Sequence, residues 1–247
     1  MDTATSKRQP SLAGSAQGAR LWELQSFDVD RLRQDLAIAT RGWDWKRGCF
    51  GHSLPLTTRE LSEFGATHYN NLIKHVDGKP ESEAPDKLNE CPYFREIFHS
   101  FRCEKSSFRI LRRAAHTSYT LHRDRDMGEN TFRFQIPIES NPDVRLLVST
   151  TDEGDDFIVS GTDYRKMEDW TAEGISNDAV KSWFDEFVRL NDDRVRVYRM
   201  QPGKLYYFST PANYHNLWNF GHADRFTLAI DLVGNDWLYE HYPVILE

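Results

Sequence analysis

The 247-residue chain has few cysteines, no excess of basic residues and no long apolar run. Its three cysteines, Cys49, Cys91 and Cys103, form no Cys-x-x-Cys pair, which argues against a disulfide framework and indicates thiols in a reducing compartment. No run of about 18 apolar residues could span a membrane, and the N-terminus lacks the apolar stretch of a signal peptide, so we expect a cytoplasmic protein. The 31 Lys and Arg against 38 Asp and Glu give a net charge of −7, which argues against a nonspecific nucleic-acid binder.

Aromatic residues are plentiful, since 15 Phe, 10 Tyr and 7 Trp supply enough large apolar side chains for one substantial core. Residues 1–20 are mainly small, polar or charged and predict a disordered tail, which leaves a single domain over residues 21–247. Helical signals dominate residues 21–105, and strand signals dominate residues 106–240, with a helical insertion at 162–192. These patterns predict a mainly β fold with flanking helices that support it.

Three helices are predicted in the N-terminal part of the domain. Asp28 can cap the first helix, and Thr57 and Glu60 form a Thr-x-x-Glu capping box for the second. Residues 77–90 predict a loop, and Pro92 suits the first position of a short third helix. The apolar stripes of the three helices recur at spacings of three and four: Val29, Leu32 and Leu36; Leu61, Phe64, His68, Leu72 and Val76; and Phe94, Ile97, Phe98 and Phe101.

From residue 107 onward the dominant hydrophobic period is two, which is typical of strands with one apolar face. Residues 201–204 read Gln-Pro-Gly-Lys, a type II turn signature. Seven or eight short strands favour a sandwich or jelly roll. The insertion at 162–192 has apolar residues at helical spacing around Trp183, and we expect it to pack against the barrel or to cover its mouth. The expected strands are 132–138, 144–149, 157–160, 194–200, 205–209, 214–219 and 226–232.

Two of these strands carry polar side chains opposite their apolar faces, namely Arg133 and Gln135 on one strand and Arg225 and Thr227 on the other. If the apolar faces pack on the helices, these side chains point into the barrel, where an unpaired arginine would destabilise the fold. A polar or anionic ligand inside the barrel would compensate that charge. The alternative is that these faces meet solvent, as in many antiparallel sheets.

The most specific local motif is His-x-Asp, formed by His122 and Asp124. Residues two apart lie on one face of an extended segment, so both side chains can reach one metal ion. His215, on another predicted strand, could add a third ligand, and two histidines with one carboxylate are typical of non-haem Fe(II) oxygenases. His222 and Asp231 could serve a different pairing, so the spacing leaves the ligand set open.

Arg225 follows His215 after one short hairpin and is a candidate anion ligand. Arginine binds a carboxylate through two parallel charge-assisted hydrogen bonds, which is what a dicarboxylate co-substrate requires. The alternative is an ordinary ion pair between Arg225 and Asp231. His116 shares a strand face with His122 and is interpreted as a residue of the pocket or its surroundings.

Several motifs occur in a fixed order: His122-x-Asp124, Arg133-x-Gln135-x-Pro137, Pro202-Gly203-Lys204 with Phe208, His215-x3-Asn219, Arg225 and Asp231. This string, over about residues 107–235, resembles the aspartyl/asparaginyl β-hydroxylase family. That family is a branch of the Fe(II)/2-oxoglutarate dioxygenases and includes bacterial free-proline hydroxylases. The resemblance implies a double-stranded β-helix, which is a cupin-like jelly roll.

By the same resemblance, His122, Asp124 and His215 bind Fe(II), and Arg225 holds the distal carboxylate of 2-oxoglutarate, with O2 as the other co-substrate. Arg133 matches an arginine that can hold the carboxylate of an amino-acid substrate, with Gln135 in place of the family's frequent histidine. Asp124 keeps the carboxylate that related halogenases replace, which favours hydroxylation. Some relatives bind 2-oxoglutarate with a hydroxyl-bearing residue at a position that is leucine in this chain.

We therefore expect an Fe(II)/2-oxoglutarate-dependent dioxygenase that hydroxylates a C–H bond of a carboxylate-bearing small molecule, a free amino acid or a derivative. Two alternatives stay open at this point. One is a protein or peptide side-chain hydroxylase, in which the N-terminal helical part docks a macromolecule. The other is a non-catalytic cupin that binds a small anion or a metal.

Overall fold

The computed structural model describes residues 20–45, 52–56, 75–76, 79–80, 87–124, 127, 130–149 and 166–246. The expected tail at 1–20, most of the helix expected between Thr57 and Val76, and the strand expected at 157–160 lie outside these residues. Val76 itself belongs to a short strand, β3 (His75–Val76), which pairs with β4 (Lys79–Pro80), so the helix prediction is wrong at its C-terminal end. The Asp-Gly sequence between these strands favours a two-residue hairpin, and this turn signal outweighs the helical period.

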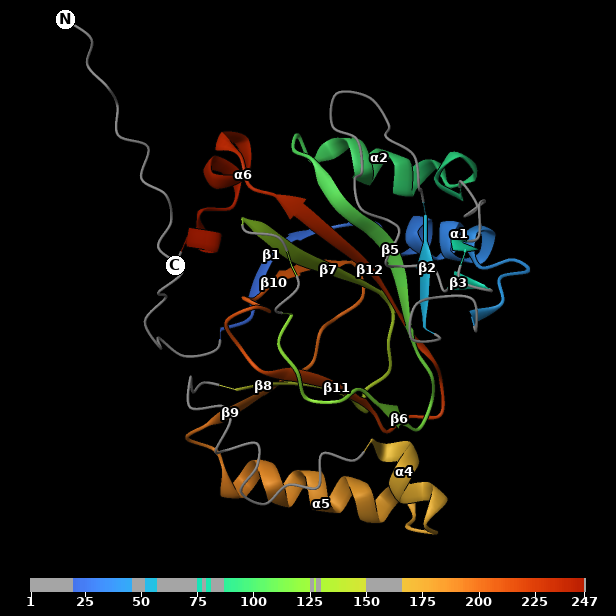
Figure 1. Cartoon of the computed structure of the whole chain (residues 1–247), viewed down its shortest axis with the longest axis vertical. Coiled ribbons are helices and arrows are strands. Elements are labelled where there is room, and N and C mark those ends of the chain that lie inside the picture. Colours follow the sequence, from blue (N-terminus) through green and yellow to red (C-terminus); the bar gives the residue numbers. More distant parts are fainter. Residues whose placement is uncertain are drawn as a thin grey trace, which may run out of the picture.

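Two antiparallel sheets face each other and form the body of the protein, as Figure 1 shows. The larger sheet has the order β1-β10-β7-β12-β5-β2, and the smaller sheet has the order β6-β11-β8-β9. This is the mainly β, double-stranded β-helix architecture that the sequence predicted. The strands are β1 (Trp22–Ser26), β2 (Ser53–Pro55), β5 (Lys105–Arg113), β6 (Thr117–Ser118), β7 (Thr131–Glu139), β8 (Val144–Ser149), β9 (Val195–Tyr198), β10 (Lys204–Tyr207), β11 (His215–Asn219) and β12 (Arg225–Val233).

Helices cover the outer face of the larger sheet (Figure 1). α1 (Val29–Ala39) begins where Asp28 accepts hydrogen bonds from two backbone amides, and α2 (Pro92–Ser100) begins at its proline, as predicted. Phe94 and Phe98 of α2 are fully buried against the sheet. The 3-10 helices η5 (Lys87–Glu90) and η6 (Pro243–Leu246) and the helix α6 (Asp236–His241) complete this layer.

Residues 21–105, where helical signals dominate, also contribute β1 and β2, which are the two edges of the larger sheet. β1 pairs with β10, and β2 pairs with β5, in both cases through backbone hydrogen bonds. Strands this short contain too few residues to show a clear hydrophobic period. Their pairing depends on the neighbouring strand.

The insertion forms two helices, α4 (Met167–Ala172) and α5 (Asn177–Leu190), which pack on the outer face of the smaller sheet (Figure 1). Trp170 and Phe184 lie in one cluster with Leu147 and Trp218 of that sheet. Of the two placements that the sequence allowed, the structure shows packing against the barrel.

The apolar side chains of β7 and β12 point outward toward the helices, among them Phe134 and Ile230. Because side chains alternate along a strand, Arg133, Arg225 and Thr227 face the interior between the two sheets. Arg225 is 4% exposed and Thr227 is fully buried, so the solvent-facing alternative is wrong for β12.

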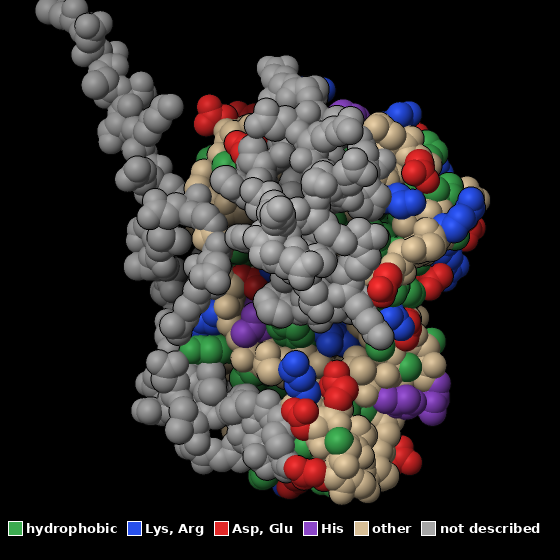
Figure 2. Space-filling view, turned by 45° about the vertical axis from the view of Figure 1, so that its right-hand side comes forward, with side chains coloured by type: hydrophobic (Ala, Val, Ile, Leu, Met, Phe, Trp, Pro, Cys, Tyr) green, Lys and Arg blue, Asp and Glu red, His purple; other side chains and the backbone are tan. Residues whose placement is uncertain are grey.

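The surface of the described part mixes charges of both signs, and Figure 2 shows acidic and basic side chains side by side on one face. No helix among the described residues is both long enough and apolar enough to cross a membrane.

One buried cation, Lys105, lies in the core beside α2. Lys105 is fully buried, its Nζ donates to the carbonyl of Phe101 at 2.5 Å, and Nζ lies 4.6 Å from the ring centroid of Phe98. Burial lowers the pKa of Lys105 to about 8. The charged lysine is therefore less stable in the folded chain than in the unfolded chain.

Lys105→Met is expected to raise the free energy of unfolding at pH 7 by on the order of 2 kcal/mol. Below pH 8 the lysine is protonated in both states and its full destabilising effect is present. Between pH 8 and about 10.5 the folded chain loses this proton before the unfolded chain does, so the stability difference between the two proteins shrinks. Urea unfolding of both proteins at pH 7 and pH 10 measures this, and an equal difference at both pH values would contradict it.

Candidate metal centre and anion pocket

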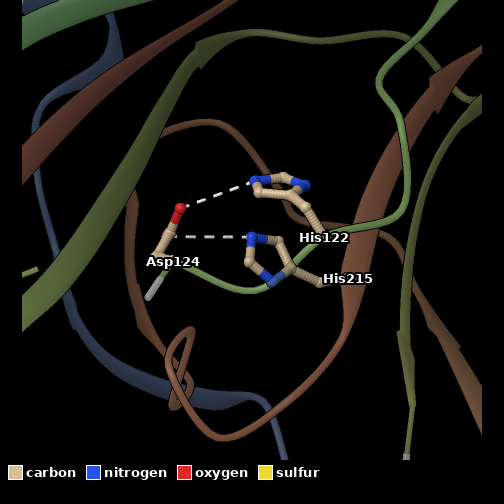
Figure 3. A group of neighbouring side chains, drawn as sticks. All are labelled: His122, Asp124 and His215. Atoms are coloured by element: carbon tan, nitrogen blue, oxygen red, sulfur yellow. Dashed lines mark ion pairs between the residues drawn. The ribbon is translucent and has the colours of Figure 1, made fainter. Parts of the chain in front are cut away.

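Backbone pairing brings the His-x-Asp segment next to β11. The amide of His122 donates to the carbonyl of His215 at 3.1 Å, and the amide of His215 donates back to the carbonyl of His122 at 2.9 Å. Asp124 follows two residues later, and its amide donates to the carbonyl of Thr210 at 3.2 Å. One ligand atom from each of His122, Asp124 and His215 therefore lies within 4.8 Å of the others (Figure 3). These three residues are the candidate metal centre.

The two imidazoles present the same nitrogen to the carboxylate. His122 Nε2 lies 3.5 Å from Asp124 Oδ1, and His215 Nε2 lies 3.8 Å from Asp124 Oδ2 (Figure 3). On the other side of each ring, Nδ1 faces a backbone carbonyl, of Thr120 at 2.8 Å and of Asn213 at 3.0 Å. A carbonyl only accepts, so each Nδ1 donates to it, which leaves Nε2 as the ring nitrogen that can bind a metal.

The charge state of the centre also suits a cation. Burial and the neighbouring His122 lower the pKa of His215 to about 4, so its imidazole is neutral at neutral pH. Burial opposes ionisation of Asp124, but His122, Arg133 and His215 together outweigh it and hold the pKa of that carboxyl well below its usual range. The centre thus offers one negative charge and two imidazole nitrogens, of which that of His215 belongs to a neutral ring.

Arg133 connects the candidate metal centre to β12. Its Nε and Nη2 donate to the two carboxylate oxygens of Asp231 at 2.7 and 2.9 Å, and its Nη1 donates to Asp124 Oδ2 at 2.6 Å. Arg133 therefore fixes Asp124 through Oδ2, while Oδ1 points toward His122. Gln135 follows on the same inner face of β7, in register with Ala229 of β12.

The alternative pairings considered from the sequence do not form. Asp231 pairs with Arg133 and lies 3.8 Å from Arg109 Nη2, so the Arg225–Asp231 ion pair is wrong. His222 contacts His116 and does not join the metal-ligand group found among the described residues.

Arg225 lies between the two sheets, in register with Arg113 of β5. Its Nε and Nη2, the Nε of Arg113 and the hydroxyl of Thr227 are buried and have no hydrogen-bond partner in the described part of the chain. Burial and the Arg113 charge lower the pKa of Arg225 well below its ordinary value. We call Arg113, Arg225 and Thr227 the anion pocket, because an anion bound there would satisfy these donors and compensate the buried charge of Arg225 and the half-buried charge of Arg113.

The sequence did not single out Arg113, and it offered Asp231 for other pairings than the one with Arg133. Period-two alternation places Arg113 on the inner face of β5, but the identity of its neighbour on β12 depends on strand register. Leu111 lies in register with Thr227, so at this level of the pocket the hydroxyl comes from β12 and not from β5.

No family model and no curated protein matches this chain. Among solved structures, it is similar to the nickel complex of the non-heme monooxygenase ThoJ, with 11% identity over 87% of this chain and 74% of the other, at a TM-score of 0.43. It is also similar to a Pseudomonas putida prolyl-4-hydroxylase, with 15% identity over 89% and 95% of the two chains and a TM-score of 0.39. AviO1 from Streptomyces viridochromogenes shares 10% identity over 89% and 92%, with a TM-score of 0.42.

Proposed function

We propose that this protein is an Fe(II)- and 2-oxoglutarate-dependent dioxygenase that hydroxylates a carboxylate-bearing small molecule, a free amino acid or a derivative. The observation that carries this proposal is the convergence of His122, Asp124 and His215, with ligand atoms within 4.8 Å of one another. Two imidazoles and one carboxylate on one side of a metal leave positions open for substrate or oxygen. Bound ferrous iron would supply the activation of O2 that hydroxylation of a C–H bond requires.

The residues of the candidate metal centre fit a ferrous ion. Both Nε2 atoms face the Asp124 carboxylate, Asp124 is ionised, and Arg133 holds Oδ2 so that Oδ1 stays oriented toward His122. Arg133 acts here as a positioning residue, since outer partners of this kind orient metal ligands and tune their affinity.

The anion pocket supports the choice of 2-oxoglutarate as co-substrate. Its buried, unpaired donors suit one carboxylate of a dicarboxylate. The opposite end of the molecule would extend toward the candidate metal centre. Arg225 would bind and orient this carboxylate, and Thr227 would donate a further hydrogen bond. Leu146, Val148 and Phe208 form an apolar cluster with Tyr206 between the sheets, which limits the access of water.

Arg133 would also hold the substrate carboxylate. Its guanidinium has five N–H donors, of which three bind Asp124 and Asp231, so two remain. We propose that these donors and the Gln135 amide face the substrate. A substrate that carries a carboxylate next to the oxidised carbon would suit this arrangement.

The test supplies the chain with Fe(II), ascorbate, O2 and 2-oxoglutarate and screens amino acids, their derivatives and peptides. We expect succinate together with a product that is heavier than one amino-acid substrate by one oxygen atom. If only peptides give a product, the substrate is a peptide and not a free amino acid, and the proposed reaction is unchanged. No succinate with any substrate would leave a non-catalytic cupin and contradict the proposal.

A further inference from the structure

Two histidines outside the candidate metal centre face each other at one end of the larger sheet. His116 lies in the turn between β5 and β6, and His222 lies in the hairpin between β11 and β12. His116 Nε2 is 3.0 Å from His222 Nδ1, and the ring centroids are 4.6 Å apart. We call these two residues the histidine pair.

The two turns that carry the histidine pair are joined by buried and half-buried side chains. Asn219 Nδ2 donates to the carbonyls of Ala114 at 3.0 Å and Ala223 at 2.9 Å, one in each turn. Asp224 Oδ1 accepts from the amide of Ala115 at 3.0 Å. The backbones below the two imidazoles are therefore fixed relative to each other, as preorganised ligand sites require.

His116 adopts a conformation that few non-glycine residues adopt, with φ at 54°. Such strained backbone is found mainly where the surrounding structure enforces it, and it is concentrated at ligand sites and switch regions. The ring nitrogen Nδ1 of His116 is buried and has no hydrogen-bond partner in the part of the chain that the structure describes. The ring therefore interacts through Nε2, the atom that faces His222.

We propose that the histidine pair is a second metal site, which binds Zn²⁺ or another late first-row divalent cation through His116 Nε2 and His222 Nδ1. Imidazole nitrogen is a preferred ligand of these ions. Two nitrogens at 2.0–2.1 Å from a tetrahedral zinc are about 3.3 Å apart, so the observed 3.0 Å needs a small rotation of the exposed His222 ring. The hydrogen that the two nitrogens share moves to the other nitrogen of its ring, which frees both ligand atoms. Water completes the coordination, because both oxygens of nearby Asp224 are used by Arg112 and Ala115.

This site would cross-link the turn that follows β5 to the hairpin that precedes β12. Arg225 is the first residue of β12, so an ion bound to the histidine pair would stabilise the hairpin directly before the anion pocket. The proposal stands on the histidine pair alone and does not depend on the proposed enzymatic function.

The test uses an untagged variant, His122→Ala/His215→Ala, that lacks the ligands of the candidate metal centre. Titration calorimetry is expected to show one Zn²⁺ bound per chain with micromolar affinity, and bound zinc is expected to raise the melting temperature. Adding His222→Ala should weaken this binding at least tenfold, and adding His116→Asn should do the same. Asparagine is chosen at position 116 because it tolerates the positive φ of that residue. Adding His99→Ala, which removes an exposed histidine on α2, should leave binding unchanged.

Absence of zinc binding in the double variant, or equal binding after His222→Ala, would overturn the proposal and leave an ordinary hydrogen bond between the rings. If the double variant does not fold, the wild-type chain and His222→Ala are compared instead. The proposal then requires that the number of bound Zn²⁺ ions falls by one in the variant, and an unchanged number would overturn it.

Discussion

His215→Ala is expected to abolish metal binding and 2-oxoglutarate turnover while the chain remains folded. His215 supplies one of three ligands. Removal of a residue that merely supports a ligand lowers metal affinity by about 10- to 100-fold, so loss of His215 itself should lower it by more. The backbone bonds between His122 and His215, at 3.1 and 2.9 Å, do not involve the ring. The strand pairing that positions His122 and Asp124 should therefore survive the substitution.

The measurement combines binding of Mn²⁺, a redox-stable substitute for Fe(II), with succinate formation and circular dichroism. His241→Ala is the matched control, because it removes an exposed histidine that stacks on Trp237, far along the chain from the centre. We expect the control to keep both Mn²⁺ binding and succinate formation. Turnover or tight Mn²⁺ binding in folded His215→Ala would show that His215 is not a metal ligand.

The local part of this site could be predicted from the sequence, and its long-range part could not. His122 and Asp124 share a face wherever this segment is extended, so their convergence follows from parity alone. His215 joins them only because its backbone pairs with that of His122, and no spacing rule specifies this bridge. The ordered string of motifs, through its family resemblance, supplied what periodicity left open.

Arg133 shows where sequence reasoning stops. Alternation along β7 correctly placed it opposite the apolar side chains and left open whether that face is the inner one. Its strongest partner, Asp231, is a cross-strand neighbour on β12. That register includes an irregularity between Phe226 and Thr227, and a shift of one residue would turn Asp231 to the opposite face. The ion pair that the sequence offered, Arg225 with Asp231, does not form because the two residues lie on one strand and are separated by about 20 Å along it.

The helices followed their end signals more faithfully than the edge strands followed theirs. The Asp28 cap and Pro92 mark where α1 and α2 begin, because both signals act within one helical turn. β1 depends on backbone bonds to β10, which lies almost at the other end of the chain. Elements stabilised by such distant partners carry little local signal of their own.

Arg225→Met is expected to produce two opposite effects, which together test the anion pocket. The guanidinium is buried beside Arg113, and two of its nitrogens have no hydrogen-bond partner among the described residues. Replacing an uncompensated buried charge with an apolar side chain of similar length should raise the free energy of unfolding of the ligand-free chain by about 1–3 kcal/mol. The same change removes the donors for 2-oxoglutarate, and its apparent KM should rise on the order of 100-fold or more.

Urea unfolding without ligand gives the first effect, and succinate formation against 2-oxoglutarate concentration gives the second. Added 2-oxoglutarate with Mn²⁺ should raise the melting temperature of the wild-type chain but not that of Arg225→Met, because only the wild type binds the dicarboxylate. Arg189→Met is the matched control, since this exposed arginine of α5 pairs with Glu186 and should change neither property. A variant that loses stability without ligand, yet keeps the wild-type KM, would show that Arg225 is an ordinary structural residue and that the co-substrate binds elsewhere.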